Sequence, residues 1–409
     1  MFGFIPKSSA MRLCYSWLTA LTEGEGGSNT QESPRRILHV VENLNHGSVE
    51  NWLVRMLGHA RKRKIDVDWT FYCTLGQPGA RDDEARALGA RVTHSPLPIG
   101  EKLAFVRALR AELRRGKYDV LHCHHDLVSA VYLLAAVGLP IGKRIVHVHN
   151  ADEEVLTPNA LKQSILRPLL RRACLVMADN IVGNSNHSLD TFISGRRRRK
   201  GVDIVRYLGV DSIRFEKAKG DRLGFRRELG LAEDSRILLF AGRMVPEKNP
   251  VFAVDVLAEM HRLDPAIVGV FVGSGALDKA VRQRGVELGL ADTMRYLGWR
   301  DDIPEIMCCC DWFIIPHPER PVEGFGLAVV EAQLAGLRML LSRGILDDPL
   351  LPTASFCRLA LSAGPKIWAE AAIDLLRRLP PSRAAALTSL RESPMDMDRS
   401  LKGLLELHT

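Results

Sequence analysis

Short apolar runs alternate with longer amphipathic segments from residue 36 onwards, and this alternation predicts strands and helices in a repeating β-α order. Between residues 49 and 61, for example, apolar side chains recur at helical spacing from Trp52 to Leu57. The predicted strands of this first series are 36–41, 67–72, 91–94, 120–123, 143–149 and 180–184, with 203–211 as the last strand and exit. Such a series predicts a parallel sheet that helices cover on both faces.

A second β-α series begins at Ser235. Its predicted strands are 237–242, 268–273, 294–297, 312–316 and 338–342, its predicted helices are 250–261, 277–288 and 327–335, and residues 364–409 are predicted to be helical. The fold class is therefore α/β, with two doubly wound, Rossmann-like domains in tandem. Domains of this kind leave a cleft between the carboxyl ends of their strands, where their ligands bind.

The length of 409 residues suits two domains of ordinary size. Residues 1–35 form a polar leader rich in Gly and Ser, which has nothing to pack and which we expect to be disordered. The first domain is predicted over 36–211 and the second over 212–379, with a helical extension at 380–409.

The apolar runs and the cysteines of the chain indicate the cellular compartment in which the protein is expected. The longest apolar run, 128–141, is too short to span a bilayer, and residues 13–21 are too polar for a signal peptide. The eight cysteines include no C-x-x-C pair and no metal-ligand spacing, so we interpret them as small buried hydrophobes in a reducing compartment. We therefore expect a cytoplasmic protein.

One candidate binding motif lies between the predicted strand 312–316 and the predicted helix 327–335. It runs Glu323-Gly324-Phe325-Gly326-Leu327 and continues to Glu331. Free backbone N–H groups at the start of such a helix, together with the helix dipole, provide a seat for phosphate oxygens. Glu331 follows one turn into the helix and is suited to ribose hydroxyls, while Glu323 in the preceding loop can meet a sugar hydroxyl.

A second candidate motif follows the predicted strand 237–242 and runs Gly242-Arg243-Met244-Val245-Pro246-Glu247-Lys248-Asn249. Because it also leaves the carboxyl end of a strand, Arg243 and Lys248 are expected to face the same cleft. Two cations can neutralise a diphosphate leaving group, and each charge-assisted contact contributes roughly 1.5–3 kcal/mol. Either motif alone is compatible with an ordinary β-α turn, but the two together favour a binding site for a phosphorylated ligand.

Gly-Arg-x4-Lys-Asn, followed by Glu-x7-Glu with Gly-Phe-Gly between the two glutamates, resembles the family 4 retaining glycosyltransferases of the GT-B fold, and the likeness extends from about Ile37 to Leu379. The stretch 144–150 is similar to the bacterial exopolysaccharide branch of that family. The resemblance implies that Arg243 and Lys248 bind the donor diphosphate, that Glu331 holds the ribose, and that Glu323 holds the transferred sugar. It also implies that the backbone of Phe325, Gly326 and Leu327, with Gly324 and Gly242, completes the donor site.

The histidines at the end of the predicted strand 143–149 are a further candidate. The family has a histidine near the donor sugar, and the resemblance carries that role to His149, with His147 as the alternative. The segment His122-Cys123-His124-His125-Asp126 resembles a metal site, but neighbouring side chains of a strand point to opposite faces, so one ion would not bind them all. We interpret the segment as a loop on the acceptor side and expect no metal site.

One position departs from the family pattern Gly-Gly-x-Glu, because this chain has Gly47-Ser48-Val49-Glu50. Gly47 preserves a close approach of the backbone to the donor phosphate or the acceptor. Ser48 narrows the backbone conformations if its position requires a positive φ. Altered acceptor geometry or weakened activity is therefore an open alternative at this turn.

Charge is uneven along the chain. The formal net charge is +8, and residues 1–215 hold 31 Lys and Arg against 21 Asp and Glu, a difference of +10. The run Arg196–Lys200 is the densest charge, and no aromatic residues are interleaved with it, so a nucleic-acid partner is disfavoured. We expect an anionic membrane surface or a phosphorylated lipid acceptor nearby, with a solvated loop as the alternative.

These observations favour a retaining glycosyltransferase that uses a nucleotide-diphosphate sugar as co-substrate, with no cofactor and no metal requirement, and that acts on a glycan or lipid-linked acceptor in polysaccharide or cell-surface glycan biosynthesis. The first alternative is a nucleotide-sugar epimerase, which would need catalytic carboxylates that the sequence does not reveal. The second is a non-catalytic nucleotide-sugar-binding protein on the same fold. The missing third glycine at 273–278 disfavours a dehydrogenase, and the absence of Gly-Lys-Ser/Thr excludes a P-loop enzyme.

Overall fold

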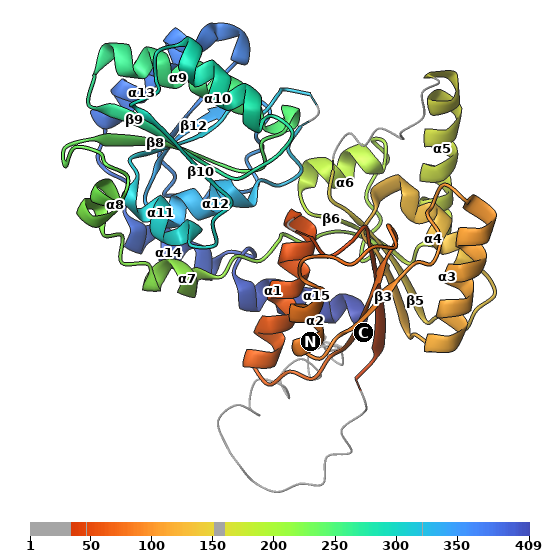
Figure 1. Cartoon of the computed structure of the whole chain (residues 1–409). Helices are drawn as coiled ribbons and strands as arrows, with labels where there is room; N and C mark the ends of the chain where they lie inside the picture. The colour runs from red at the N-terminus through yellow and green to blue at the C-terminus, as the bar shows by residue number, and fades with distance from the viewer. Residues whose placement is uncertain (1–33, 46, 151–159, 321) are drawn as a thin grey trace, which may run out of the picture. The chain divides into compact units, whose positions relative to one another are not determined.

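The computed structural model describes residues 34–45, 47–150, 160–320 and 322–409, so nearly all of the leader predicted at 1–35 lies outside the described residues. Two parallel sheets organise the described chain, each flanked by helices (Figure 1). This arrangement confirms the predicted α/β fold class with two Rossmann-like halves.

The first sheet has seven strands in the order β3-β2-β1-β4-β5-β6-β7, and all of its neighbouring strands are parallel. Its strands are β1 (Arg36–Val41), β2 (Asp68–Cys73), β3 (Arg91–His94), β4 (Val120–Cys123), β5 (Lys143–Val148), β6 (Asn180–Gly183) and β7 (Asp203–Val205). The helices of this half are α1 (Ser48–Lys62), α2 (Asp82–Ala87), α3 (Lys102–Gly116), α4 (Ser129–Ala136), α5 (Ala160–Met177) and α6 (Asn186–Phe192). The predicted last strand is shorter than expected, because it ends at Val205.

The second sheet has six parallel strands in the order β10-β9-β8-β11-β12-β13. Its strands are β8 (Arg236–Ala241), β9 (Ile267–Val272), β10 (Met294–Gly298), β11 (Trp312–Ile315), β12 (Arg338–Ser342) and β13 (Phe356–Leu359). The helices that follow α6 along the chain are α7 (Ser212–Lys217), α8 (Arg222–Glu228), α9 (Pro250–Leu263), α10 (Asp278–Glu287), α11 (Ile303–Cys309), α12 (Leu327–Leu334), α13 (Gly364–Leu376), α14 (Arg383–Glu392) and α15 (Met397–His408).

One strand of this half was not predicted. β13 pairs with β12 in parallel register from Met339 opposite Phe356 to Ser342 opposite Leu359, so the strand predicted at 338–342 is not the last of the sheet. Residues 364–409 are mostly helical, as predicted, and form the three helices α13, α14 and α15. The remaining predicted strands are confirmed. All six residues of β9 are buried, as expected for a strand covered on both faces.

The last helix, α15, returns to the first sheet and lies beside α1 (Figure 1). Asp398 of α15 accepts a hydrogen bond from His59 of α1 at 2.7 Å. At the other end of α15, His408 is buried against His122 of β4, with 3.0 Å between ring nitrogens. No helix among the described residues combines the length and apolar character needed to cross a membrane.

Candidate active site

A cavity of about 1530 Å³ lies at the carboxyl ends of the strands of both sheets. It brings together nearly all of the predicted site residues. Those that line it are Gly47, His149, Gly242, Arg243, Lys248, Glu323, Phe325, Gly326, Leu327 and Glu331. Gly324 does not line the cavity, although both of its neighbours do. The position at the strand ends is where parallel sheets bind ligands.

The expected phosphate seat is the start of α12. Gly326 precedes this helix with φ of +79°, a left-handed conformation that glycine adopts without strain, and no side chain caps the helix. The first backbone N–H groups of α12 are therefore free of a side-chain acceptor. Gly324 has a packing role instead, because a Cβ there would clash with the carbonyl oxygen of His149.

Lys248 and Glu323 form an ion pair in the cavity, and His317 lies 3.6 Å from the same carboxylate. Burial raises the pKa of the Glu323 carboxyl, but the positive charge of Lys248 and the neighbouring His317 outweigh burial, so its pKa falls below the usual value. Glu323 is therefore ionised at neutral pH. The sequence assigned these two residues to different parts of a ligand, whereas the structure places them in direct contact.

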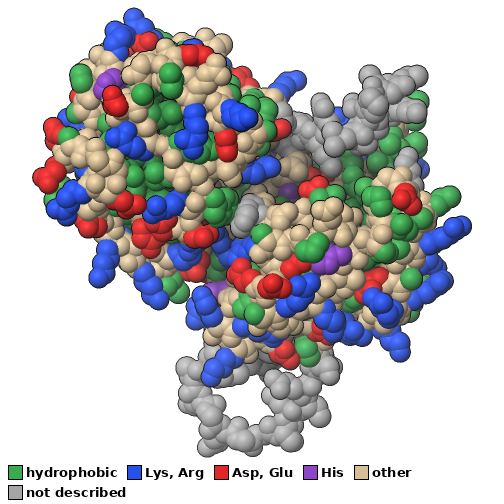
Figure 2. Space-filling view, in the orientation of Figure 1, with side chains coloured by type: hydrophobic (Ala, Val, Ile, Leu, Met, Phe, Trp, Pro, Cys, Tyr) green, Lys and Arg blue, Asp and Glu red, His purple; other side chains and the backbone are tan. Residues whose placement is uncertain are grey.

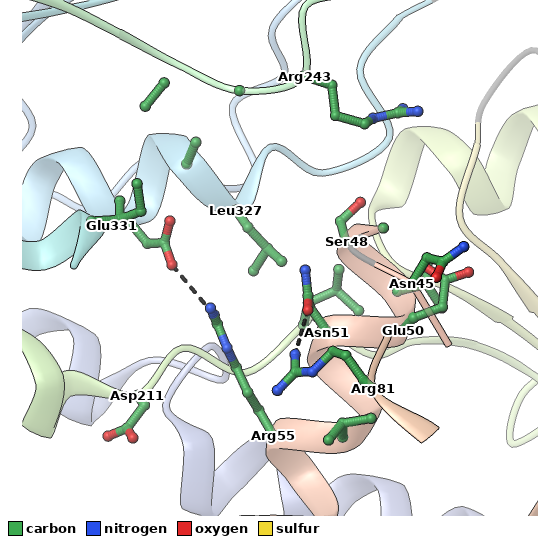
Figure 3. Close-up of a pocket in the computed structure, with 18 of the residues that line it drawn as sticks. Asn45, Ser48, Glu50, Asn51, Arg55, Arg81, Asp211, Arg243, Leu327 and Glu331 are labelled. Carbon is green, nitrogen blue, oxygen red and sulfur yellow. Dashed lines mark hydrogen bonds and ion pairs between the residues drawn. The ribbon is translucent and has the colours of Figure 1, made fainter. Parts of the chain in front are cut away.

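Arg243 follows β8 and points into the cavity from the side of the second sheet (Figure 3). Its side chain is exposed, and its positive charge acts to lower the pKa of the Glu50 and Glu323 carboxyls. Asn249, directly after Lys248, has φ of +48° and precedes α9, which begins at Pro250. Arg243 and Lys248, on either side of Pro246, both line the cavity.

Glu331 lies in α12 and meets Arg55 of α1, with 3.5 Å between Oε1 and Nη1 (Figure 3). Burial lowers the pKa of the Arg55 guanidinium, and the charge of Glu331 acts in the opposite direction. The Glu331 carboxylate is mostly covered, with its side chain 16% exposed. Sequence reasoning did not find Arg55, because 276 positions separate it from Glu331 and no motif connects them.

His149 lines the cavity, whereas His147 is fully buried and does not line it. The backbone N–H of His149 donates to Asp126 at 2.7 Å, and its carbonyl oxygen accepts a hydrogen bond from Asn184 at 2.9 Å. Burial, followed by the nearby His147 and His125, lowers the pKa of His149 well below its usual value. The ring is therefore neutral at physiological pH.

The interpretation of residues 122–126 as an acceptor-side loop is wrong. His122, His124 and Asp126 are buried, and none of the five residues lines the cavity. The reason is that β4 lies between β1 and β5 with all four of its residues buried, and that His408 of α15 packs against His122.

The turn from Gly47 to Glu50 opens α1. Gly47 precedes the helix in an extended conformation with φ of −68°, and a Cβ on it would clash with the Glu50 carboxylate. Ser48 is the first residue of the helix and does not have a positive φ. The departure from Gly-Gly-x-Glu therefore causes no backbone strain. Burial raises the pKa of Glu50 to about 7, against the lowering effects of its own backbone N–H and of Arg243. Glu50 is the last residue of the Gly-Gly-x-Glu pattern, and it lines the cavity although the sequence analysis assigned it no role.

The basic run Arg196–Lys200 is partly neutralised. Arg196 and Arg199 both bind Asp203, and Arg198 binds Asp190 at 2.7 Å. On the face drawn in Figure 2, Lys and Arg side chains are scattered among acidic and apolar ones. The positive excess of the sequence therefore does not form one continuous patch on that face.

The chain is similar to known glycosyltransferases. The family described as Glycosyltransferase Family 4 matches residues 49–212, and the family described as Glycosyl transferases group 1 matches residues 221–345. The putative glycosyltransferase EpsF of Bacillus subtilis (strain 168) is 26% identical over 383 residues, covering 92% of this chain and 97% of EpsF. The D-inositol 3-phosphate glycosyltransferase of Salinispora arenicola (strain CNS-205) is 30% identical over 353 residues, covering 78% of this chain and 75% of the relative.

Among solved structures, Anabaena Alr3699/HepE in complex with UDP superposes with a TM-score of 0.71 at 18% identity, covering 91% of this chain and 98% of that protein. The chain shares the two-sheet GT-B fold of such enzymes. It belongs to the family 4 glycosyltransferases, a class of enzymes that form glycosidic bonds.

Proposed function

We propose that this protein is a retaining glycosyltransferase that moves a sugar from a nucleotide-diphosphate sugar to a glycan or lipid-linked acceptor in polysaccharide or cell-surface glycan biosynthesis. The observation that carries the proposal is that Arg243, Lys248 and the uncapped start of α12 all line one cavity. Two cations and a helix amino terminus in one cavity match the charge of a diphosphate. The UDP complex of Alr3699/HepE supports a nucleotide donor for this fold.

The proposed reaction breaks the bond between the anomeric carbon and the diphosphate oxygen and forms a bond from that carbon to the acceptor oxygen. The proton of the acceptor hydroxyl passes to the leaving diphosphate on the same face of the sugar, so the anomeric configuration is retained. Arg243 and Lys248 stabilise the negative charge that develops on the diphosphate, which is the largest contribution that a protein makes to such a step. In this proposal these cations do the work that a metal ion could otherwise do, and the enzyme needs no cofactor.

The Lys248–Glu323 ion pair fits a site whose charges are set before the donor binds. When a diphosphate arrives, Lys248 can contact it while Glu323 accepts a hydrogen bond from a hydroxyl of the transferred sugar. Glu331 is proposed to accept hydrogen bonds from the ribose hydroxyls, and His149 to border the transferred sugar. Gly47 brings the backbone before α1 close to the donor or the acceptor.

Calorimetric titration with nucleoside diphosphates, followed by a turnover assay with nucleotide sugars, tests the proposal. Binding and turnover are both expected. Binding without any turnover would instead support the alternative of a non-catalytic nucleotide-sugar-binding protein. Membership in a glycosyltransferase family favours transfer over the epimerase alternative.

A further inference from the structure

Five histidines share one face of the first sheet. His39 lies in β1 opposite His122 of β4, and His124, His147 and His149 follow on β4, β5 and the residues just after them. Alternate residues of a strand point to the same face, so the pairs at positions 122 and 124 and at 147 and 149 stand side by side. Their ring centroids are 4.2 Å and 4.3 Å apart.

His408 of α15 covers this face as a sixth member. We call these six residues the histidine cluster: His39, His122, His124, His147, His149 and His408. None of them is more than 5% exposed.

The histidine cluster consists of two hydrogen-bonded strings of three rings. In the first, His124 Nε2 lies 3.1 Å from His39 Nδ1, and His124 Nδ1 lies 3.1 Å from His149 Nε2. In the second, His122 joins His408 at 3.0 Å and His147 at 3.3 Å. The chemistry of the rings leaves both strings incomplete. A neutral imidazole has one donor and one acceptor, so three rings linked by two bonds keep one donor and one acceptor unpaired.

The unpaired atoms are at the ends of the strings. They are His39 Nε2, His149 Nδ1, His147 Nε2 and His408 Nδ1, which have no hydrogen-bond partner among the described residues. A buried polar group without a partner costs roughly 1–3 kcal/mol. One of the four, His147 Nε2, belongs to a ring that stacks on His149 with 4.3 Å between the ring centroids, so a nitrogen without a partner lies beside the rings of His124 and His149.

The chemistry of the side chains narrows the kind of ligand. Each ring can offer a nitrogen lone pair, and imidazole nitrogen is a preferred ligand of transition-metal ions such as Zn²⁺ and Cu²⁺.

We propose that His124, His147 and His149 bind a transition-metal ion of the zinc type. One ring nitrogen from each of these three residues lies within 4.8 Å of the others. His124 Nδ1 and His149 Nε2 are 3.1 Å apart, close to the roughly 3.3 Å between two tetrahedral ligands whose Zn–N bonds are about 2.0–2.1 Å. For His147, the nitrogen without a hydrogen-bond partner is Nε2.

The surrounding rings suit this assignment. His39 contacts the other nitrogen of His124, and His122 contacts the other nitrogen of His147. Partners of this kind fix the orientation of metal-bound imidazoles and set their tautomer. Three imidazoles leave a fourth coordination position open, and an all-nitrogen set suits Zn²⁺, Cu²⁺, Ni²⁺ or Co²⁺.

A second set of three rings in the cluster, His39, His122 and His124, also has one nitrogen each within 4.8 Å of the others. Only the proposed triad is accessible from the cavity, because His149 lines it and no residue of the second set does. An ion can therefore reach the site from the cavity, and once bound it would hold the ring of His149 in place at the cavity wall. This inference departs from the sequence expectation of a protein without a metal site, and it does not depend on the proposed transferase reaction.

Zinc titration of the untagged, chelator-treated full-length chain tests the proposal. We expect one Zn²⁺ per chain by calorimetry, a rise in melting temperature with Zn²⁺, and visible bands of low-coordinate Co²⁺ when cobalt replaces zinc. His124→Gln and His147→Gln should each weaken binding tenfold or more. His187→Gln, at a half-buried position outside the cluster, should bind as the wild type does.

X-ray absorption at the zinc edge of the wild-type chain keeps the test decisive if a cluster variant fails to fold. A spectrum in which every protein ligand of the zinc is an imidazole nitrogen supports the proposal. Sulfur ligation would overturn it, because it would place the ion at the separate group of Cys73, Asp82 and His94. No stoichiometric binding, or binding unchanged in folded His124→Gln and His147→Gln, would also overturn it.

Discussion

Lys248 of the turn after β8 and Glu323 of the loop after β11 form an ion pair across 75 positions of the chain. The contact joins the two sequence motifs that were recognised separately, and it explains why the Glu323 carboxyl stays ionised although it is half-buried. A donor that binds here meets a lysine whose position is already set. Preorganised charge of this kind is what lowers the barrier for departure of a diphosphate.

The first prediction concerns the two cations. Lys248→Ala and Arg243→Ala should each lower turnover by about two orders of magnitude or more, because each removes a preorganised charge from the leaving group. Steady-state kinetics with a nucleotide sugar checks this. Lys279→Ala, at an exposed position of α10, is the matched control and should keep full activity. A folded Arg243 or Lys248 variant with most of its activity would show that the diphosphate binds elsewhere.

Glu331 provides the second prediction. Its carboxylate should accept hydrogen bonds from the ribose hydroxyls, and loss of the acceptor leaves polar groups unpaired at roughly 1–3 kcal/mol for each buried group. Glu331→Ala should therefore weaken nucleoside diphosphate binding tenfold or more, and Glu331→Gln should be milder.

The ion pair of Glu331 with Arg55 defines the competing explanation for the same carboxylate. Measuring nucleoside diphosphate affinity and melting temperature together in Glu331→Ala, Glu331→Gln and Arg55→Ala separates the two. If Glu331→Ala lowers the melting temperature but leaves affinity unaltered, Glu331 serves only to hold α12 against α1.

The sequence predicted most strands because buried parallel strands are continuous apolar runs whose signal is local. β13 was missed because Phe356-Cys357-Arg358-Leu359 is short and interrupted by a charge. The site motifs were found because each occupies a single turn. The Arg55–Glu331 contact and the histidine cluster depend on which strands and helices become neighbours, and that information is not local. For the histidine cluster a partial signal existed, since positions 122 and 124 and positions 147 and 149 have the period-2 spacing of a shared face.

Glu50 provides a pH-dependent prediction. Its pKa of about 7 in the folded chain is above the usual value of 4.5, so the folded state binds the proton more tightly than the unfolded state. The cost of ionising Glu50 is therefore absent below pH 4.5 and grows as the pH rises to about 7.

Glu50→Gln removes this cost, and its stabilising effect should be present at pH 8 and vanish below pH 4.5. Since Glu50 is only half-buried, we expect about 1 kcal/mol at pH 8, or about 2–4 °C in melting temperature. Melting curves of both proteins at several pH values measure the difference. A variant as stable as the wild type at every pH would contradict the raised pKa.

The basic amino-terminal half leads to a prediction of reversible association with anionic membranes. Binding to vesicles that contain an anionic lipid should fall steeply with salt, because the Debye length is only about 10 Å at 0.1 M. Arg197 and Lys200 are exposed, whereas Arg196, Arg198 and Arg199 are engaged by aspartates. Arg197→Ser with Lys200→Ser should therefore weaken co-sedimentation. Absence of co-sedimentation at low salt in the wild type would contradict the proposed membrane partner.

The central claim is that this enzyme releases a sugar from a nucleotide-diphosphate donor with retention at the anomeric carbon. The most direct measurement is proton NMR of donor hydrolysis, without acceptor, over a panel of nucleotide sugars and at times shorter than mutarotation. We predict that at least one donor is cleaved, that nucleoside diphosphate is released, and that the first free sugar has the anomeric configuration of the donor. A first product with the opposite configuration, or no cleavage of any donor by the folded enzyme, would contradict the account.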